Sequence, residues 1–310
     1  MKYLLNYTRW VALYEAREFN LDQKDLILLS GPSASGKTYF AMNQLGAKHW
    51  YDDLDAETVL VGTDNFNNPE VGPAFIKLVE EAGMPTLAKI AAETDSPHVI
   101  KLYDDKFKEW EEEASPEEKS KYEEIERIAG YDPEKCKSTI RKMGGRQGDG
   151  RVSAMAWAAA LLSAKTILFD DVGDAIKNYY DSDKIKDVLI FTPLDKYLEN
   201  IISRNNSENT TEHIDTSDQE SGIYQYLDWY QAVDEPDLDD KKYTSDEIKS
   251  KLEEAGYSNT EEILNKFEVT DSLKDGFYIG LKDWVKPNRI INSRDAGTGR
   301  AESAAGITAL

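Results

Sequence analysis

The octapeptide at residues 31–38, GPSASGKT, is the stretch of this sequence whose residue types and spacing are best suited to chemistry. It matches the phosphate-binding pattern G-x-x-x-x-G-K-[ST] in full, and we call it the P-loop. The glycines let such a loop curl until its backbone N–H groups point at phosphate oxygens. The lysine reaches the β- and γ-phosphates, and the last hydroxyl ligates Mg²⁺. The predicted ligands of a nucleoside triphosphate are Gly31, Ser33, Ala34, Ser35, Gly36, Lys37 and Thr38.

Aspartates follow two apolar runs that are typical of buried strands. Asp64 comes just after residues 58–62, and Asp170 and Asp171 come just after residues 166–169. Because ligands collect at the carboxyl ends of parallel strands, we expect both positions to face the P-loop. Asp64 would accept the proton of a substrate hydroxyl, and Asp170, the nearer to its strand, would hold Mg²⁺. The alternative for Asp64 is a turn or helix-capping residue, and the sequence does not exclude Asp171 as the metal ligand.

Positive charge gathers at residues 135–151 (KCKSTIRKMGGRQGDGR), which hold six basic residues and one acidic residue. Four glycines in this segment predict a mobile loop. A basic loop in an acidic protein is suited to clamp an anionic substrate or the transferred phosphoryl group. Arg146 and Arg151 are the preferred substrate-binding residues. The alternative is a solvated segment that pairs with the acidic helices beside it.

Arg204 is the second basic candidate. It lies where the helix predicted after residues 187–191 gives way to a polar stretch. We interpret residues 204–222 as a lid over the nucleotide, in which an arginine stabilises charge on the transferring group. The alternative is a helix C-terminal arginine that interacts with the helix dipole.

Four short apolar runs alternate with helical segments along the chain. This order implies right-handed crossovers and an α/β fold, a three-layer αβα P-loop NTPase with a mostly parallel sheet. A helix is expected to begin near Lys37, and an alanine-rich helix at residues 153–164 should be buried. Thr192 is expected to cap the helix after the fourth strand. The predicted strands are residues 26–29, 58–62, 166–169 and 187–191.

Three segments lie outside this alternating pattern. Residues 67–152 are interpreted as a large acidic helical insertion, with a capping box that begins at Ser115. Residues 222–268 should be helical, with a second capping box at Thr244, and two late strands are expected at 277–280 and 289–292. The predicted organisation is an N-terminal helix or targeting segment at 1–20, one P-loop domain at 21–294, and a flexible tail at 295–310.

The composition limits the partners and the compartment. The 310 residues carry a formal net charge of −22, so nucleic acid and anionic membranes are disfavoured as partners. No apolar run is long enough to span a bilayer, and the N-terminus lacks the pattern of a secretory signal. Cys136 is the only cysteine, which favours a cytoplasmic location without disulfides. The three histidines lack metal-ligand spacing, so zinc is not expected.

With these residues in hand, the chain resembles P-loop kinases of small substrates, in particular the zeta-toxin and chloramphenicol-phosphotransferase-like group. The resemblance covers residues 24–66 and 153–206. In that group a second strand ends in an aspartate, which implies that Asp64 is the substrate-activating base. A later helix carries lid arginines, which matches Arg204. The acidic insertion and the C-terminal third depart from the group, so the resemblance does not imply a particular substrate.

Three weaker resemblances point elsewhere. GPSASGKT is similar to the P-loop of tRNA prenyltransferases, but the acidic charge is unsuited to tRNA. Residues 170–173 (DDVG) fit the D-x-x-G pattern of GTPases, yet the guanine-reading N-K-x-D pattern is missing. The N-terminus resembles capsid-targeting peptides of tailed phages, with L-x-E at residues 13–15, which would place the protein in a capsid. The simpler interpretation of that N-terminus is an amphipathic helix.

The sequence therefore predicts an enzyme, an ATP- and Mg²⁺-dependent kinase with a small hydroxyl-bearing acceptor, and the basic segment 135–151 favours an anionic one. The missing guanine pattern favours ATP over GTP. The first alternative is a nucleotide-gated switch or ATPase, for which the acidic insertion would be a docking surface for a protein partner. The second alternative is a P-loop transferase that modifies nucleic acid.

Overall fold

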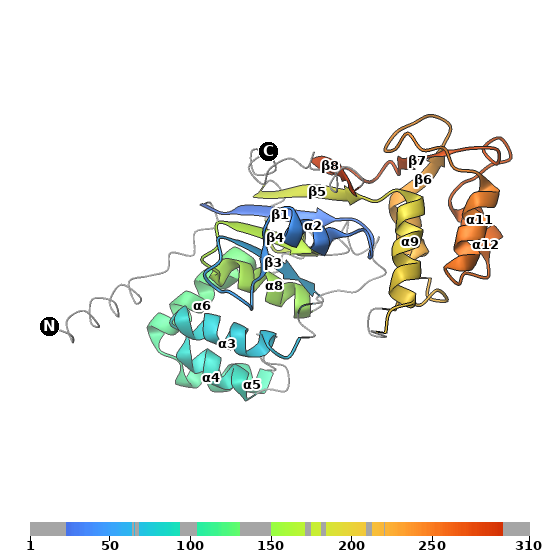
Figure 1. Ribbon diagram of the computed structural model, residues 1–310. Coiled ribbons are helices and arrows are strands. Elements are labelled where there is room, and N and C mark those ends of the chain that lie inside the picture. Colours follow the sequence, from blue (N-terminus) through green and yellow to red (C-terminus); the bar gives the residue numbers. More distant parts are fainter. Residues whose placement is uncertain are drawn as a thin grey trace. The chain divides into compact units, whose positions relative to one another are not determined.

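The computed structural model describes residues 23–63, 65, 68–93, 104–130, 150–170, 175–180, 184–208, 213–219 and 221–293 (Figure 1). The chain divides into two compact units. Unit 1 comprises Met1–Leu28 and Gly46–Lys186, and unit 2 comprises Leu29–Leu45 and Asp187–Leu310. The segments predicted at 1–20 and 295–310 lie outside the described residues.

Six strands form the central sheet in the order β2-β3-β4-β1-β5-β8. The pairs β2–β3, β3–β4 and β5–β8 are parallel. The four predicted buried strands are all present, because continuous apolar runs can be covered on both faces. The α/β class and the mostly parallel sheet flanked by helices are thus confirmed. The strands are β1 (Asp25–Ser30), β2 (Lys48–His49), β3 (Thr58–Gly62), β4 (Thr166–Asp170), β5 (Ile185–Phe191) and β8 (Arg289–Asn292).

The predicted insertion between β3 and β4 consists, in its described part, of helices joined by short turns. One buried carboxylate ties three of its helices together. Glu118 of α6 is 2% exposed, and its Oε1 accepts hydrogen bonds from Leu87 N of α4 at 2.8 Å and Trp110 Nε1 of α5 at 3.3 Å. The predicted cap of α6 is confirmed, since Ser115 Oγ accepts from Glu118 N at 3.1 Å. The helices are α3 (Val71–Glu81), α4 (Pro85–Ala92), α5 (Asp104–Glu113) and α6 (Pro116–Ala129).

Helix α8 (Gly150–Leu161) is the buried helix expected at residues 153–164, and it packs against β3. Residues 154–162 are all buried, and their many alanines allow a close approach to the sheet. A short 3₁₀ helix, η3 (Ala175–Asn178), follows β4 and contacts α8. Among the helices of the described residues, the length and apolar character that a bilayer span requires do not occur together.

In unit 2, a helix follows the P-loop and several more follow β5. Thr244 caps α11 as predicted, since its Oγ1 accepts from Glu247 N at 3.2 Å. The expectation of helix throughout residues 222–268 is wrong at β6, which pairs with β7 in a separate antiparallel sheet. The elements are α2 (Lys37–Asn43), α9 (Leu194–Asn205), α10 (Ile223–Trp229), β6 (Tyr230–Val233), α11 (Ser245–Glu254), α12 (Thr260–Lys266) and β7 (Tyr278–Leu281).

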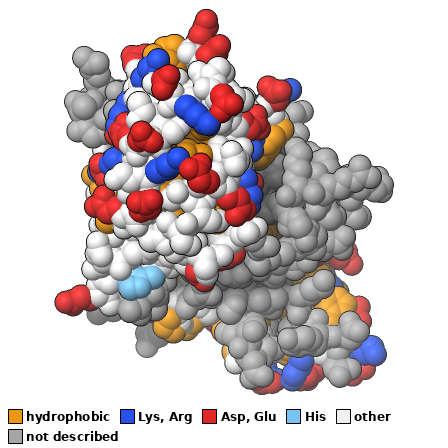
Figure 2. All heavy atoms as spheres, turned by 90° about the vertical axis from the view of Figure 1, so that its right-hand side faces the viewer, with side chains coloured by type: hydrophobic (Ala, Val, Ile, Leu, Met, Phe, Trp, Pro, Cys, Tyr) orange, Lys and Arg blue, Asp and Glu red, His pale blue; other side chains and the backbone are white. Residues whose placement is uncertain are grey.

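Several buried tyrosines pack against one another in the core beneath these helices. The rings of Tyr197 and Tyr226 lie 4.6 Å apart, and those of Tyr226 and Tyr230 lie 4.4 Å apart. Burial raises the pKa of each of these hydroxyls. The outer surface is different: Figure 2, seen from the side of α11 and α12, shows acidic and basic side chains interspersed, as in the ion pair of Lys249 with Glu261.

Candidate phosphate-binding site

The P-loop follows β1 directly, and its backbone turns through left-handed conformations. Gly31 has φ +130°, Ala34 has φ +66° and Gly36 has φ +85°. Left-handed residues within a short loop rotate neighbouring peptide planes, so that N–H groups converge on one concave side. Gly36 is also the N-cap of α2, and it supplies no side-chain cap, which leaves the first turn of the helix open to an external acceptor.

The two glycines are required for different reasons. A Cβ added to Gly31 would lie 3.1 Å from Ile190 O and 3.2 Å from Ser35 Oγ, so the position lacks room as well as demanding a positive φ. A Cβ added to Gly36 would meet nothing within 4 Å, so only the backbone conformation demands glycine there. Ala34 adopts a positive φ without being glycine, which the sequence pattern did not predict.

Lys37 folds back over the start of the loop. Its side chain is 5% exposed, and Nζ donates hydrogen bonds to Gly31 O at 3.0 Å and to Pro32 O at 3.1 Å. A buried ammonium group requires such acceptors, because burial without them is very costly. A phosphate oxygen would be a stronger, charge-assisted acceptor than either carbonyl. The ammonium is therefore held inside the loop where an anion can replace its present partners.

Ser35 contributes a buried, unsatisfied hydroxyl to the loop. The residue is 1% exposed, and Oγ has no hydrogen-bond partner among the residues that the structure describes. Leaving a buried hydroxyl without a partner costs about 1–3 kcal/mol. Oγ would lie 3.2 Å from a Cβ added to Gly31, beside the start of the loop. A ligand oxygen there would satisfy this donor.

Three side chains contact the loop backbone, one from the residue that follows β5, one from α9 and one from α10. Gln225 Oε1 accepts from Ser33 N at 2.9 Å, and Asn200 Nδ2 donates to Ala34 O at 2.9 Å. Thr192 Oγ1 donates to Ser35 O at 2.7 Å. The expectation that Thr192 caps α9 is wrong, because Pro193 is the N-cap and makes no side-chain cap bond. The threonine hydroxyl binds the P-loop backbone and not the start of α9.

Arg204 lies in the last turn of α9 and is exposed. It is four residues after Asn200 and therefore lies on the same face of the helix, about 6 Å further along the axis. Part of the predicted lid is anchored to this helix, since Asn205 Oδ1 accepts from Ile214 N at 2.8 Å. Thr38 is exposed in the first turn of α2. The roles of Arg204 and Thr38 stay predictions.

In unit 1, the carboxyl ends of β3 and β4 lie side by side. Gly62 pairs with Asp170, and a Cβ added to Gly62 would lie 3.4 Å from the Cβ of Asp170. Asn65 Oδ1 accepts from Gly62 N at 2.9 Å, and its Nδ2 lies 3.4 Å from His49 Nδ1. Hydrogen-bonding side chains thus gather at the end of β3. Sequence reasoning missed His49, because β2 is only two residues long.

Four predicted site residues lie wholly or partly outside the described residues. Asp64, Asp171 and Arg146 lie outside the described residues, and Arg151 is described only through its backbone at the start of α8. No group of three or more His, Cys, Asp or Glu residues suited to a metal ion occurs in the described part of the chain.

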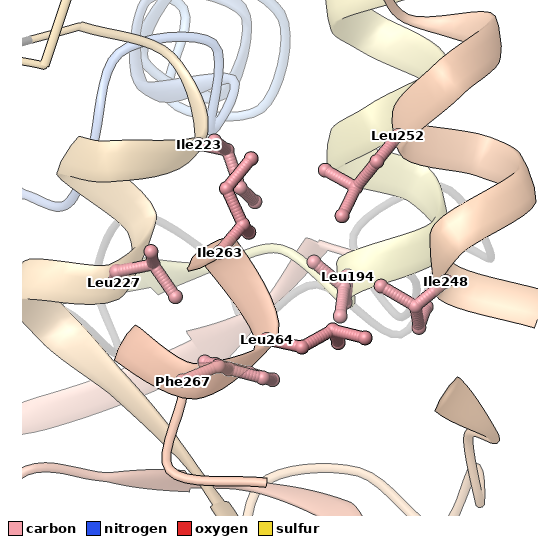
Figure 3. A pocket seen from close by; sticks show the side chains of 8 residues that line it. All are labelled: Leu194, Ile223, Leu227, Ile248, Leu252, Ile263, Leu264 and Phe267. Atoms are coloured by element: carbon pink, nitrogen blue, oxygen red, sulfur yellow. The ribbon is translucent and has the colours of Figure 1, made fainter. Parts of the chain in front are cut away.

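An apolar cavity lies elsewhere in unit 2, among α9, α10, α11 and α12 (Figure 3). Its interior volume of about 10 Å³ matches a single water molecule, far below the size of a metabolite site. Ile223 and Leu227 of α10 point into it, on the opposite side of the helix from Gln225. The cavity side chains therefore fix α10 in place. They are Leu194, Ile223, Leu227, Ile248, Leu252, Ile263, Leu264 and Phe267.

Comparisons with protein-family models, with curated proteins and with solved structures found no match to this chain.

Proposed function

We propose that this chain is a P-loop NTPase that acts as an ATP- and Mg²⁺-dependent phosphotransferase. It transfers the γ-phosphoryl group to a hydroxyl of a small metabolite, and the basic segment 135–151 favours an anionic one. The observation that carries the proposal is the P-loop, whose left-handed backbone is combined with a buried ammonium group and an unsatisfied buried hydroxyl. Each of these features suits a polyphosphate anion.

At the donor end, the backbone N–H groups at the start of α2 would bind the β-phosphate, and Lys37 would move from its two carbonyls to the β- and γ-phosphates. Ser35 Oγ would donate to a phosphate oxygen. The Thr38 hydroxyl would ligate Mg²⁺, which supplies charge neutralisation when bound. The backbone N–H of Ser33 would contact the ligand only after breaking its hydrogen bond to Gln225 Oε1.

At the acceptor end, Asp64 would accept the proton of the attacking hydroxyl, and Asp170 would assist in holding Mg²⁺. The pairing of Gly62 with Asp170 supports these roles, because residues that follow β3 leave the sheet at the same edge as Asp170. Arg204 would stabilise charge on the transferring group, and Arg146 and Arg151 would bind the acceptor.

The transfer step is tested by a screen of metabolites for ATP-dependent phosphorylation, followed by Asp64→Asn on any acceptor found. We expect the variant to keep nucleotide affinity and to lose at least 100-fold in kcat, a typical contribution of a positioned base, ~10²–10⁴. The matched control is Asp55→Asn, an exposed aspartate in the loop before β3, which should leave kcat unchanged.

The outcomes separate the proposed functions. Full activity of Asp64→Asn shows that the base assignment is wrong. Nucleotide hydrolysis without any acceptor, combined with a protein partner whose binding depends on nucleotide, favours the switch. Phosphorylation of nucleic-acid ends in place of metabolites favours the nucleic-acid alternative.

A further inference from the structure

Three consecutive residues of the P-loop are each held through the backbone by a side chain from another element. Gln225 accepts a hydrogen bond from the N–H of Ser33. Asn200 donates to the carbonyl of Ala34, and Thr192 donates to the carbonyl of Ser35. We call these three side chains the clamp. All of them belong to unit 2, as does the loop itself.

The clamp complements the bonds that the loop makes to itself. Lys37 Nζ engages the carbonyls of Gly31 and Pro32, and Phe40 N engages the carbonyl of Gly36 at 2.9 Å. Together with Asn200 and Thr192 of the clamp, these donors bind five of the six carbonyls of residues 31–36. A carbonyl oxygen that turned toward a phosphate would repel it, so the bonds from Asn200 and Thr192 to the carbonyls of Ala34 and Ser35 favour a concave side lined by donors.

The clamp is attached to firmly packed elements. Thr192 is 1% exposed, and the hydroxyl of Tyr226 donates to its carbonyl at 3.0 Å. Gln225 projects from α10, which Ile223 and Leu227 fix by packing against α11 and α12 (Figure 3). Side chains held in this way keep their rotamers, so they can restrain a loop at little additional entropic cost.

We propose that Thr192, Asn200 and Gln225 are positioning residues that hold the P-loop in its present shape before a ligand arrives. The consequence for affinity rests on the proposed nucleotide function, whereas the effect on the loop itself does not. A loop shaped in advance need not be ordered during binding, so losing a clamp bond weakens nucleotide binding without touching the nucleotide.

The sharpest test compares Thr192→Val with Thr192→Ser in the full-length chain. Valine removes the hydroxyl at nearly constant volume, whereas serine keeps it. We expect Thr192→Val to raise the Kd for Mg·ATP by about 3- to 10-fold, the effect of one hydrogen bond, and Thr192→Ser to restore it. Amide hydrogen exchange in peptides that cover residues 31–38 should accelerate in the valine variant alone.

A second pair guards against a folding defect at the buried threonine. Gln225→Leu removes the acceptor for Ser33 N, and Gln231→Leu removes a comparable bond from Gln231 Nε2 to Leu281 O at 3.0 Å, away from the loop. We expect faster exchange in residues 31–38 and weaker Mg·ATP binding for Gln225→Leu only.

Unchanged exchange and affinity in both Thr192→Val and Gln225→Leu overturn the proposal, and so does an equal loss in Gln231→Leu. If the wild-type chain binds no Mg·ATP, the proposed function fails separately, and the exchange measurements alone decide whether the clamp positions the loop.

Discussion

Alanine substitutions at the two P-loop glycines should destabilise the protein to different extents, because only Gly31 lacks room for a methyl group. At Gly36, φ is +85° and ψ is +18°, and an added Cβ meets nothing within 4 Å. The cost is therefore the left-handed backbone alone, roughly 1–2 kcal/mol. Alanine also restricts the unfolded chain, which offsets about 0.4–1 kcal/mol of that cost. The expected net loss for Gly36→Ala is about 1 kcal/mol.

At Gly31 two costs add. The conformation at φ +130° is one that side chains rarely adopt, which costs on the order of 1–3 kcal/mol. The Cβ would also press on Ile190 O at 3.1 Å, and a backbone oxygen in β5 has little freedom to move, so crowding adds roughly 1–3 kcal/mol. We expect Gly31→Ala to lose about 3 kcal/mol or more.

Thermal unfolding distinguishes the two substitutions. At about 2.1 cal/mol/K of unfolding entropy per residue, 1 kcal/mol corresponds to about 1.5 °C in a chain of 310 residues, so Gly36→Ala should lower Tm by about 1–2 °C and Gly31→Ala by roughly 4–5 °C or more. Gly46→Ala is the matched control, because Gly46 has φ +68° with nothing within 4 Å and lies outside the loop. It should behave like Gly36→Ala. Equal losses at Gly31 and Gly36 would refute the reasoning.

Three further predictions concern stability. Glu118→Leu should cost about 2–4 kcal/mol in urea unfolding, because it leaves two buried donors without their acceptor, whereas the exposed Glu117→Leu should cost less than about 0.5 kcal/mol. Thr244→Ala should cost about 1 kcal/mol through loss of the α11 cap, and Thr244→Ser should recover most of it. Burial raises the pKa of Tyr257 from 10.0 to about 12, so the unfolded chain releases this proton first and stability falls as pH rises from about 10 to 12. Absorbance titration of tyrosinate should show this group ionising only near the upper end of that window, and ionisation at pH 10 in the folded protein would contradict the assignment.

Much of the sheet could be predicted from the sequence. The apolar runs at 58–62 and 166–169 appear as β3 and β4 because fully buried strands need no alternation of polar residues. The caps at Ser115 and Thr244 were predictable because they depend on residues three apart in the chain. Strand β6 was missed, since a four-residue strand whose burial alternates leaves too short a pattern among helices.

For the phosphate-binding site, the sequence predicted only the eight residues of the P-loop and none of the side chains that hold the loop from elsewhere in the chain. The pattern indicates which residues bind phosphate, but it says nothing of the long-range bonds from Asn200 and Gln225, which depend on tertiary packing. Thr192 was misinterpreted for the same reason. A threonine beside a proline at a helix start fits a cap locally, and only the folded chain brings Ser35 O to its hydroxyl. The unusual φ of Ala34 has no local signature either.

Isothermal titration calorimetry with Mg·ATP tests the central claim most directly. The wild-type chain should bind one equivalent saturably, and Lys37→Met, which keeps the side-chain volume but removes the ammonium group, should weaken binding by at least 10-fold. A folded wild-type protein that takes up neither Mg·ATP nor Mg·GTP would contradict the account.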